Sequence, residues 1–149
     1  MQQETIDYHL KLAWQTVFNK YNQIASSHGI TQAIGYMLIN IDTPGTAVSK
    51  LAALQGVKAT SLSRMLINME SSGLIFREMA EDDKRSILVK LTPLGLEKKK
   101  IAKSVVKNFN EYLNEHFSEA EQTQLSLLLV KLNALASAYK VDQYEQENK

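Results

Sequence analysis

Two short amphipathic segments joined by a glycine-containing turn, with a hairpin pattern directly after them, limit the possible folds of this chain more than any other feature. Residues 46–75 read TAVSKLAALQGVKATSLSRMLINMESSGLI. Gly56 lies in the turn between a short helix near residues 46–54 and a second helix. In the second helix, apolar side chains recur at helical spacing and predict one buried stripe: Leu62, Met65, Leu66 and Met69. The arrangement is typical of a helix-turn-helix.

Residues 74–92 predict an antiparallel β-hairpin, because β-branched and aromatic residues in LIFRE and SILVKL flank a short polar turn. A hairpin that directly follows a helix-turn-helix forms a winged helix. Helical periodicity also predicts helices near residues 5–27, 31–41, 93–116 and 118–139, and glycine and proline fall between most of the predicted segments. We therefore expect a mainly α fold, a winged helix-turn-helix with a two-stranded wing, flanked by N- and C-terminal helices.

The composition excludes several other classes of protein. With 149 residues and 44% apolar side chains, the chain can bury one domain core. It has no cysteine, so disulfides and thiolate metal sites are excluded. The longest run of large apolar residues, 127–130, is too short to cross a membrane, and the N-terminal sequence MQQETIDYHL has no targeting pattern. We expect a cytoplasmic protein without membrane association.

Charge is distributed unevenly along the chain. Residues 46–107 contain twelve Lys or Arg and six Asp or Glu, a net charge of +6, whereas the rest of the chain carries five bases and ten acids. A basic middle between acidic ends is typical of a surface that binds a polyanion, although such a block is also common on a plain solvated surface. Nucleic acid is therefore a candidate partner.

The face of the second helix opposite its apolar stripe is small and polar. Small hydroxyl side chains allow close approach to bases and phosphates, and Arg64 suits a bidentate contact with guanine. Ile67 fits either a thymine methyl contact or an ordinary exposed position. The alternative is a plain solvated face, on which Lys and Glu are commoner. Projection at 3.6 residues per turn places six residues on this face: Thr60, Ser63, Arg64, Ile67, Asn68 and Ser71.

The turn of the predicted hairpin, AEDDKR at residues 80–85, has three carboxylates beside two cations. Asp83 and Arg85 are two residues apart, so in extended backbone they project to the same side. The carboxylate can then hold the guanidinium ready for DNA; the alternative is a solvated acidic turn. With Asp83 as wing support, the predicted DNA-binding residues are Lys58, Thr60, Ser61, Ser63, Arg64, Asn68, Lys84 and Arg85.

Three short motifs between about residues 46 and 100 resemble the MarR (multiple antibiotic resistance regulator) family of winged-helix transcription factors. They are MESSGLI at 69–75, DKR at 83–85 and LTPLG at 91–95, which match the family's LE..GL[IV], D.R and LT..G blocks in order and spacing. Met69 replaces the usual leucine, and residues 80–82 replace a proline-containing wing entry. The resemblance implies that Arg85 enters the minor groove, that Asp83 orients it, and that the terminal helices form a homodimer.

The last predicted helix is apolar nearly all round, because leucines occupy several of its faces between residues 125 and 135. Such a helix near a chain end must be buried by something, and a second subunit is the economical explanation. We therefore predict a winged-helix DNA-binding lobe at residues 31–92. Residues 1–30 and 93–149 are predicted to form the helical dimerisation region, continuous with the lobe in one domain.

Four aromatic residues fit either an ordinary core or, as the resemblance implies, a pocket for a small aromatic or amphipathic effector: Tyr8, Trp14, Tyr21 and Tyr36. The histidines are scattered at positions 9, 28 and 116, so no metal site is expected. The sequence shows no catalytic constellation and no phosphate loop, so we expect neither an enzyme nor a cofactor.

Together these features predict a DNA-binding transcriptional regulator that acts as a repressor. It is expected to bind double-stranded DNA at a pseudo-palindromic operator as a homodimer, and to be released by a small-molecule effector. The alternative is a winged-helix module for protein-protein interaction without specific DNA binding.

Overall fold

The computed structural model describes residues 4–56, 58–82 and 86–141. By internal packing, the chain divides into two compact units, Met1–Lys107 and Asn108–Lys149. The first unit contains the winged helix and its core, and the second contains the end of helix α5 and all of helix α6. The predicted division into a lobe at 31–92 and a dimerisation region at 1–30 and 93–149 stays a prediction.

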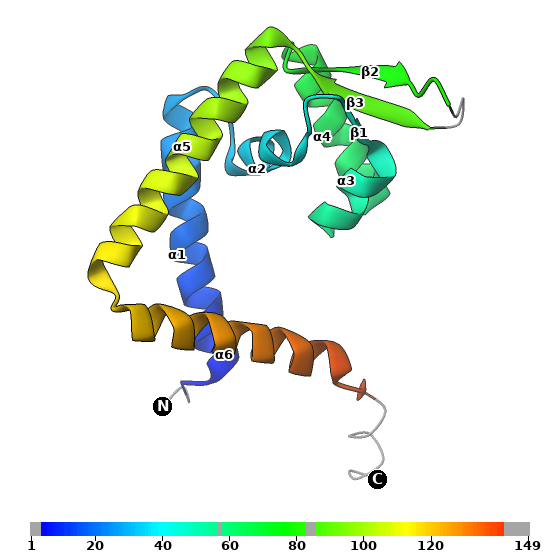
Figure 1. Ribbon diagram of the computed structural model, residues 1–149. Coiled ribbons are helices and arrows are strands. Elements are labelled where there is room, and N and C mark those ends of the chain that lie inside the picture. The colour runs from blue at the N-terminus through cyan, green and yellow to red at the C-terminus, as the bar shows by residue number, and fades with distance from the viewer. Residues whose placement is uncertain (1–3, 57, 83–85, 142–149) are drawn as a thin grey trace. The chain divides into compact units, whose positions relative to one another are not determined.

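The order of helices and strands confirms the mainly α winged-helix fold (Figure 1). Thr5 and Thr31 cap the first two helices, because their hydroxyl oxygens accept hydrogen bonds from the backbone N–H groups of Tyr8 and Ile34. The elements are α1 (Ile6–Ser27), α2 (Gln32–Asn40), β1 (Thr46–Ala47), α3 (Val48–Gln55), α4 (Ala59–Ser71), β2 (Ile75–Met79), β3 (Ile87–Leu91), α5 (Pro93–His116) and α6 (Glu119–Ala138).

The predicted two-stranded wing is present as β2 and β3, and among the described residues a third, short strand, β1, joins the sheet. Its order is β1-β3-β2, with antiparallel pairing throughout. Thr46 and Ala47, expected at the start of a helix, instead pair with Val89 and Leu88 of β3. Thr46 is 3% exposed, and its hydroxyl accepts a hydrogen bond from the N–H of Asp42 at 2.8 Å. This buried β-branched residue favours a short strand, which ties the helix-turn-helix to the wing.

The predicted apolar stripe of α4 is buried. Leu62, Leu66 and Met69 are at most 2% exposed, and Met65 is partly buried against them. The stripe therefore fixes α4 within the winged helix and leaves the opposite face of α4 toward solvent. The other members of the core cluster come from α2, α3 and the strands and their flanks: Met37, Leu38, Ile41, Leu51, Leu74, Ile75, Val89 and Leu91.

A network around Thr92 joins the end of the wing to α5. The Thr92 hydroxyl donates to the main-chain oxygen of Gly73 and accepts a hydrogen bond from the N–H of Gly95 at 3.0 Å. The Thr92 N–H donates to the main-chain oxygen of Leu74 at 3.1 Å. This geometry explains the LTPLG motif. The one threonine accepts a hydrogen bond from a backbone N–H in the first turn of α5, and it also donates to the main-chain oxygens of the turn before β2.

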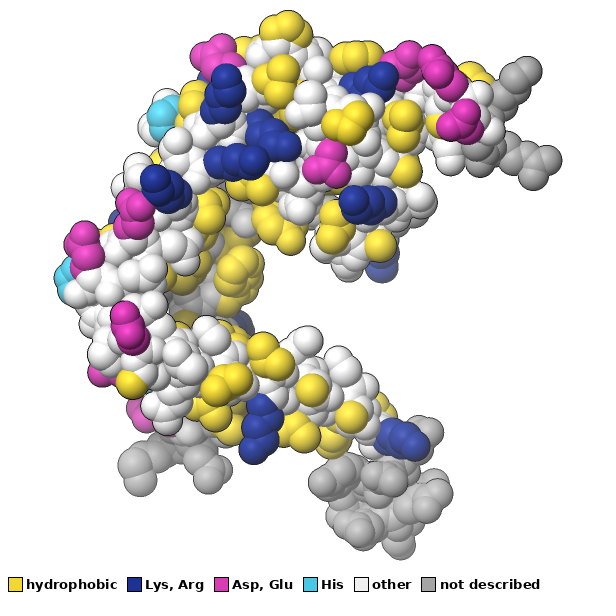
Figure 2. Space-filling model, viewed as in Figure 1, with side chains coloured by type: hydrophobic (Ala, Val, Ile, Leu, Met, Phe, Trp, Pro, Cys, Tyr) yellow, Lys and Arg dark blue, Asp and Glu magenta, His cyan; other side chains and the backbone are white. Residues whose placement is uncertain are grey.

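Helix α6, in the second unit, begins with a capping box. The Ser118 hydroxyl accepts from the N–H of Glu121 at 3.1 Å, and the Glu121 carboxylate accepts from the N–H of Ser118 at 3.3 Å. None of the α6 residues is buried. Figure 2 shows many apolar side chains on its surface, and the large exposed ones include Leu125, Leu127, Leu128, Leu129, Val130 and Leu135.

Candidate nucleic-acid interface

Helix α4 presents the polar face that its apolar stripe predicts. Lys58, at the N-cap position of α4, and Ser61 are also exposed. Because the opposite stripe is buried, these side chains are held outward, as close contact with a nucleic acid requires. All six residues predicted for this face are exposed: Thr60, Ser63, Arg64, Ile67, Asn68 and Ser71.

The turn that positions α4 depends on Gly56. This residue ends α3 with φ 58° and ψ 20°, the left-handed conformation that glycine adopts without steric cost. Leu51 of α3 and Leu62 of α4 are both at most 2% exposed and belong to one core cluster. The glycine turn and this shared core therefore set the angle between α3 and α4.

The tip of the wing lies outside the described residues. This applies to Asp83, Lys84 and Arg85, so the bracing of Arg85 by Asp83 stays a prediction. On the described side of the tip, Met79 pairs with Ile87, and the N–H of Ala80 donates to the main-chain oxygen of Ser86 at 3.0 Å. Hairpin pairing thus reaches the residues that flank the tip.

An ion pair that the sequence analysis did not predict borders the exposed face of α4. Arg77 Nε donates to Glu70 Oε2 at 2.9 Å. Arg77 follows the buried Ile75 by two residues and so lies on the same, core-directed face of β2. A charged residue at such a position needs a partner, and this alternation is the signal that could have revealed the pair. Ile67, Glu70, Ser71 and Arg77 together line a hollow beside α4.

A second ion pair lies on the other face of the same hairpin. Lys90 Nζ is 2.7 Å from Glu78 Oε2. In the strand register Lys90 pairs with Phe76, whereas the adjacent Arg77 pairs with Val89, so the two cations project from opposite faces. Among the described residues, each face of the wing thus carries a cation held by a glutamate.

Two lysines of the basic stretch form hydrogen bonds within the fold. Lys98 Nζ donates to the main-chain oxygen of His28 at 2.8 Å, and Lys99 Nζ donates to that of Ile41. These oxygens lie at the C-terminal ends of α1 and α2, where a cation is favoured. Burial, and to a smaller extent the charge of Lys103, lower the pKa of the Lys99 ammonium. Part of the basic character of residues 46–107 therefore stabilises helix ends rather than an external partner.

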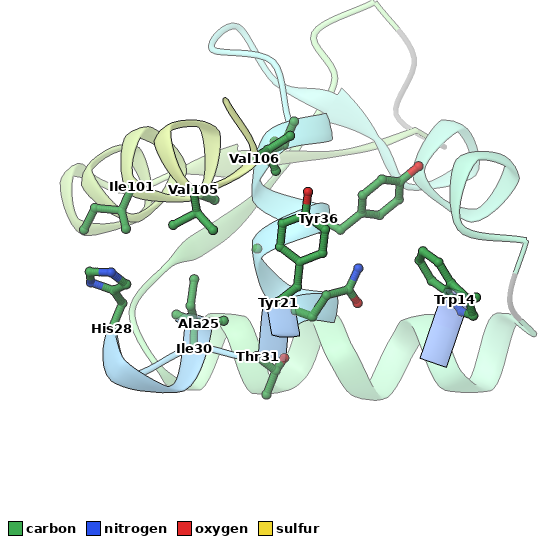
Figure 3. Close-up of a pocket in the computed structure, with 14 residues that line it drawn as sticks. Trp14, Tyr21, Ala25, His28, Ile30, Thr31, Tyr36, Ile101, Val105 and Val106 are labelled. Atoms are coloured by element: carbon green, nitrogen blue, oxygen red, sulfur yellow. The ribbon is translucent and has the colours of Figure 1, made fainter. Parts of the chain in front are cut away.

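A pocket of about 260 Å³ lies within the first unit, between α1, α2 and α5 (Figure 3). Of the aromatic residues predicted for an effector site, Trp14, Tyr21 and Tyr36 line it. Tyr8 is not among the lining residues, and its ring meets that of His9 edge-on at 5.5 Å. The rest of the wall is mainly apolar and includes Ala25, Ile30, Ile39, Ile101, Ala102, Val105 and Val106.

The part of the chain that the structure describes contains no group of three or more His, Asp or Glu side chains that could hold a metal ion. No helix in it has the length and apolar character needed to cross a membrane.

Solved structures of bacterial regulators are similar to this one. S. aureus MepR in complex with DNA matches with a TM-score of 0.80 at 22% identity, over 90% of this chain and 99% of that chain. A MarR mutant from E. coli complexed with operator DNA matches with a TM-score of 0.76 at 26% identity, over 85% of this chain and 92% of that chain. The regulator SlyA matches with a TM-score of 0.77 at 22% identity, over 89% and 94%.

One similar curated protein comes from Thauera aromatica and is named for a proposed role as transcriptional regulatory protein for the hcr operon. It is 25% identical over 129 residues, which are 85% of this chain and 78% of that protein. No protein-family profile matches the chain.

The buried stripe of α4, the glycine turn before it and the hairpin after it define a winged helix-turn-helix protein. The similarity to MarR and MepR extends over nearly the whole chain, including the helices that flank the winged helix. The fold is therefore a winged helix of the type seen in MarR and MepR, as the three sequence motifs predict.

Proposed function

We propose that this protein is a DNA-binding transcriptional regulator that acts as a repressor by occupying its operator. The observation that carries the proposal is the exposed face of α4, where small polar side chains surround Arg64. MepR and MarR, which share this fold, are solved in complex with DNA, and the relative from Thauera aromatica is named as a regulator. In this arrangement α4 enters the major groove and the wing reaches the adjacent minor groove.

The proposed contacts divide by role. Arg64 reads sequence, because a guanidinium can bond both major-groove acceptors of guanine. Lys58, next to the N-terminus of α4, contacts a phosphate, which the helix dipole also favours. Arg85 enters the minor groove, where a narrow groove concentrates negative potential. The remaining contacts to bases and phosphates come from Thr60, Ser61, Ser63, Asn68 and Lys84.

The protein acts as a homodimer. Helix α6 has no buried residue, and its exposed leucines form an apolar surface that a monomer leaves in water. A surface of this kind is typical of a protein-protein interface, and two-fold pairing is the commonest association of identical chains. A two-fold dimer reads a pseudo-palindromic operator whose half-site centres are about one helical turn apart.

The pocket between α1, α2 and α5 binds a small aromatic or amphipathic effector that releases the DNA. Its apolar wall favours burial of a ring or alkyl chain, while Tyr21, His28 and Thr31 offer hydrogen-bonding groups. A ligand that prefers one arrangement of these helices shifts the population that is competent for DNA. Trp14 is the single tryptophan of the chain and lines the pocket, so its fluorescence reports occupancy.

Fluorescence polarisation with a labelled random-sequence duplex at low salt tests the proposal. Binding that weakens steeply as salt increases is expected, because Lys and Arg displace counterions from the phosphates. Sequencing the DNA fragments retained by the purified protein then gives the operator and its symmetry. The alternative function, a winged-helix module for protein-protein interaction, predicts no binding to the duplex even at low salt.

A further inference from the structure

The Glu70–Arg77 ion pair holds a guanidinium at the edge of the exposed face of α4. Glu70 lies in the last turn of α4, and Arg77 lies in the middle of β2. Arg77 Nε donates to Glu70 Oε2 at 2.9 Å, and the two side chains are 30% and 48% exposed. The guanidinium is thus fixed by one N–H group while remaining accessible to solvent.

The surroundings of this pair connect it to the proposed reading face. Ile67 and Ser71 belong to the exposed face of α4, and both line the same hollow as Glu70 and Arg77. One wall of the hollow is therefore the helix proposed for the major groove. The other wall is the strand that leads to the tip of the wing, proposed for the minor groove.

A DNA strand must cross between these two walls if the proposed function is correct. The major and minor grooves are separated by a sugar-phosphate backbone, so a helix in one and a wing in the other lie on either side of that backbone. We infer that the hollow between α4 and β2 is a phosphate-binding site for this crossing strand, with Arg77 as its cation. The inference rests on the proposed function and adds a contact that the α4 face and the wing tip do not supply.

The chemistry of the hollow suits a phosphate. Arginine has five N–H donors in a planar fork, and with Nε bonded to Glu70 the four donors of the terminal amino groups match phosphate geometry. The carboxylate holds the fork in one direction, so less rotamer freedom is lost when the phosphate binds. Ser71 adds a hydroxyl donor on the α4 side of the hollow.

A purely structural ion pair is the competing explanation, in which Glu70 and Arg77 only hold the wing against α4. The two explanations differ in the dependence of DNA binding on salt. A phosphate contact contributes about 0.9 to the slope of log K against log salt and carries no sequence preference. A structural pair contributes nothing to the slope, because no counterion is released at that position.

The experiment compares Arg77→Gln, Arg77→Lys and Glu70→Gln by polarisation on a random duplex at several salt concentrations. Arg77→Gln should lower the slope by about 0.9 for each protomer bound, whereas Arg77→Lys and Glu70→Gln should keep the wild-type slope because residue 77 stays cationic. Lys90→Gln is the matched control. Lys90 is also bonded to a glutamate and its side chain is 29% exposed, but it lies on the opposite face of the wing.

In Arg77→Gln the Glu70 carboxylate loses its partner, which could destabilise the fold, so a double variant is also measured. Glu70→Gln/Arg77→Gln removes both charges, and its slope compared with that of Glu70→Gln isolates the contribution of Arg77. An unchanged slope in this comparison, or an equal loss for Lys90→Gln, would overturn the phosphate site while leaving the proposed function intact. If the wild-type protein binds no duplex DNA at low salt, the proposed function fails and this inference fails with it.

Discussion

A Cβ placed on Gly95 would lie 1.9 Å from the main-chain oxygen of Leu74. This contact brings the first turn of α5 against the residue that precedes β2, beside the hydrogen bonds of Thr92 to Gly73 and Leu74. The opposing atom is a main-chain oxygen in a bonded junction, so it cannot move without its neighbours. Glycine is therefore required for α5 to approach the wing this closely.

Gly95→Ala should lower the free energy of unfolding by about 3 kcal/mol, because α5 must move away from Leu74 and overpacking at a fixed backbone is costly. Gly35→Ala is the matched control, since Gly35 is also buried in a helix but its Cβ would meet Ala102 and Ile30 at an ordinary 3.7 Å. The control should be neutral or should stabilise by about 0.5–1 kcal/mol. Urea denaturation measures both changes, and equal stabilities would show that the Gly95 contact does not constrain the fold.

Lys99→Met should destabilise the fold by about 1 kcal/mol, because the main-chain oxygen of Ile41 loses its charged hydrogen-bond donor while the aliphatic stem is kept. The expected loss of stability is small because burial lowers the pKa of Lys99, so the charged form of Lys99 is already disfavoured in the folded protein. Lys100→Met is the control, since Lys100 is exposed on the same helix. Chemical denaturation near neutral pH should separate the two variants; indistinguishable midpoints would remove Lys99 as a helix cap.

The helices could be predicted from the sequence because burial imposes a helical period on it. The stripe through Leu62, Leu66 and Met69 predicts both the buried face of α4 and, by geometry, its exposed polar face. Strand β1 has only two residues, too few to show a period. Its existence depends on pairing with β3, far along the chain, so local pattern could not reveal the third strand.

The sequence predicts those parts of the candidate site that lie on one helix or strand. The exposed position of Arg64 follows from the periodicity of α4 alone. The position of Arg77, in contrast, depends on the strand register and on Glu70, which lies on a different element. The pocket is a similar case, because its wall is assembled from three helices. Trp14 and Tyr21 line the pocket, but Tyr8, on the same helix, does not. Which residues of α1 line the pocket depends on where α1 lies next to α2 and α5, and the sequence of α1 alone does not give that position.

Arg64→Ala should cost about 1–3 kcal/mol on the operator and relax the preference at one base pair in each half-site, because a bidentate base contact is specific. Lys84→Ala should instead weaken all sequences alike and lower the salt slope by about one, as for a phosphate contact. Selection from a randomised DNA pool with each variant gives the two results together. An unchanged sequence preference for Arg64→Ala would remove this residue from the base-reading set.

Leu128→Lys should convert the dimer to a monomer, because Leu128 is a 54% exposed apolar residue of α6 that the proposed interface buries. Gln124→Lys, at an exposed polar position of the same helix, should leave the dimer intact. Light scattering after size exclusion gives the mass of each variant. Deletion of everything after Phe117 should produce an unstable or aggregating protein, and a soluble, folded monomer from that deletion would contradict the dimer.

The last prediction concerns Asp83 and Arg85 at the tip of the wing, outside the described residues. If Asp83 braces Arg85, Asp83→Ala should weaken DNA binding because the guanidinium is no longer held in position. Simple electrostatics predicts the opposite, since the change removes a negative charge near the phosphates. Both effects are on the order of 1 kcal/mol for an exposed pair, so the single variant alone does not separate them.

A double-mutant cycle separates bracing from repulsion. In the Arg85→Ala background there is no guanidinium to hold, so Asp83→Ala should be neutral or should improve binding. In the wild-type background the same change should weaken binding, and the difference between the two measures the coupling. If Asp83→Ala strengthens DNA binding equally in both backgrounds, the carboxylate is a repulsive surface charge and AEDDKR is a solvated acidic turn. Salt dependence gives an independent check, because repulsion between exposed charges fades as ionic strength rises.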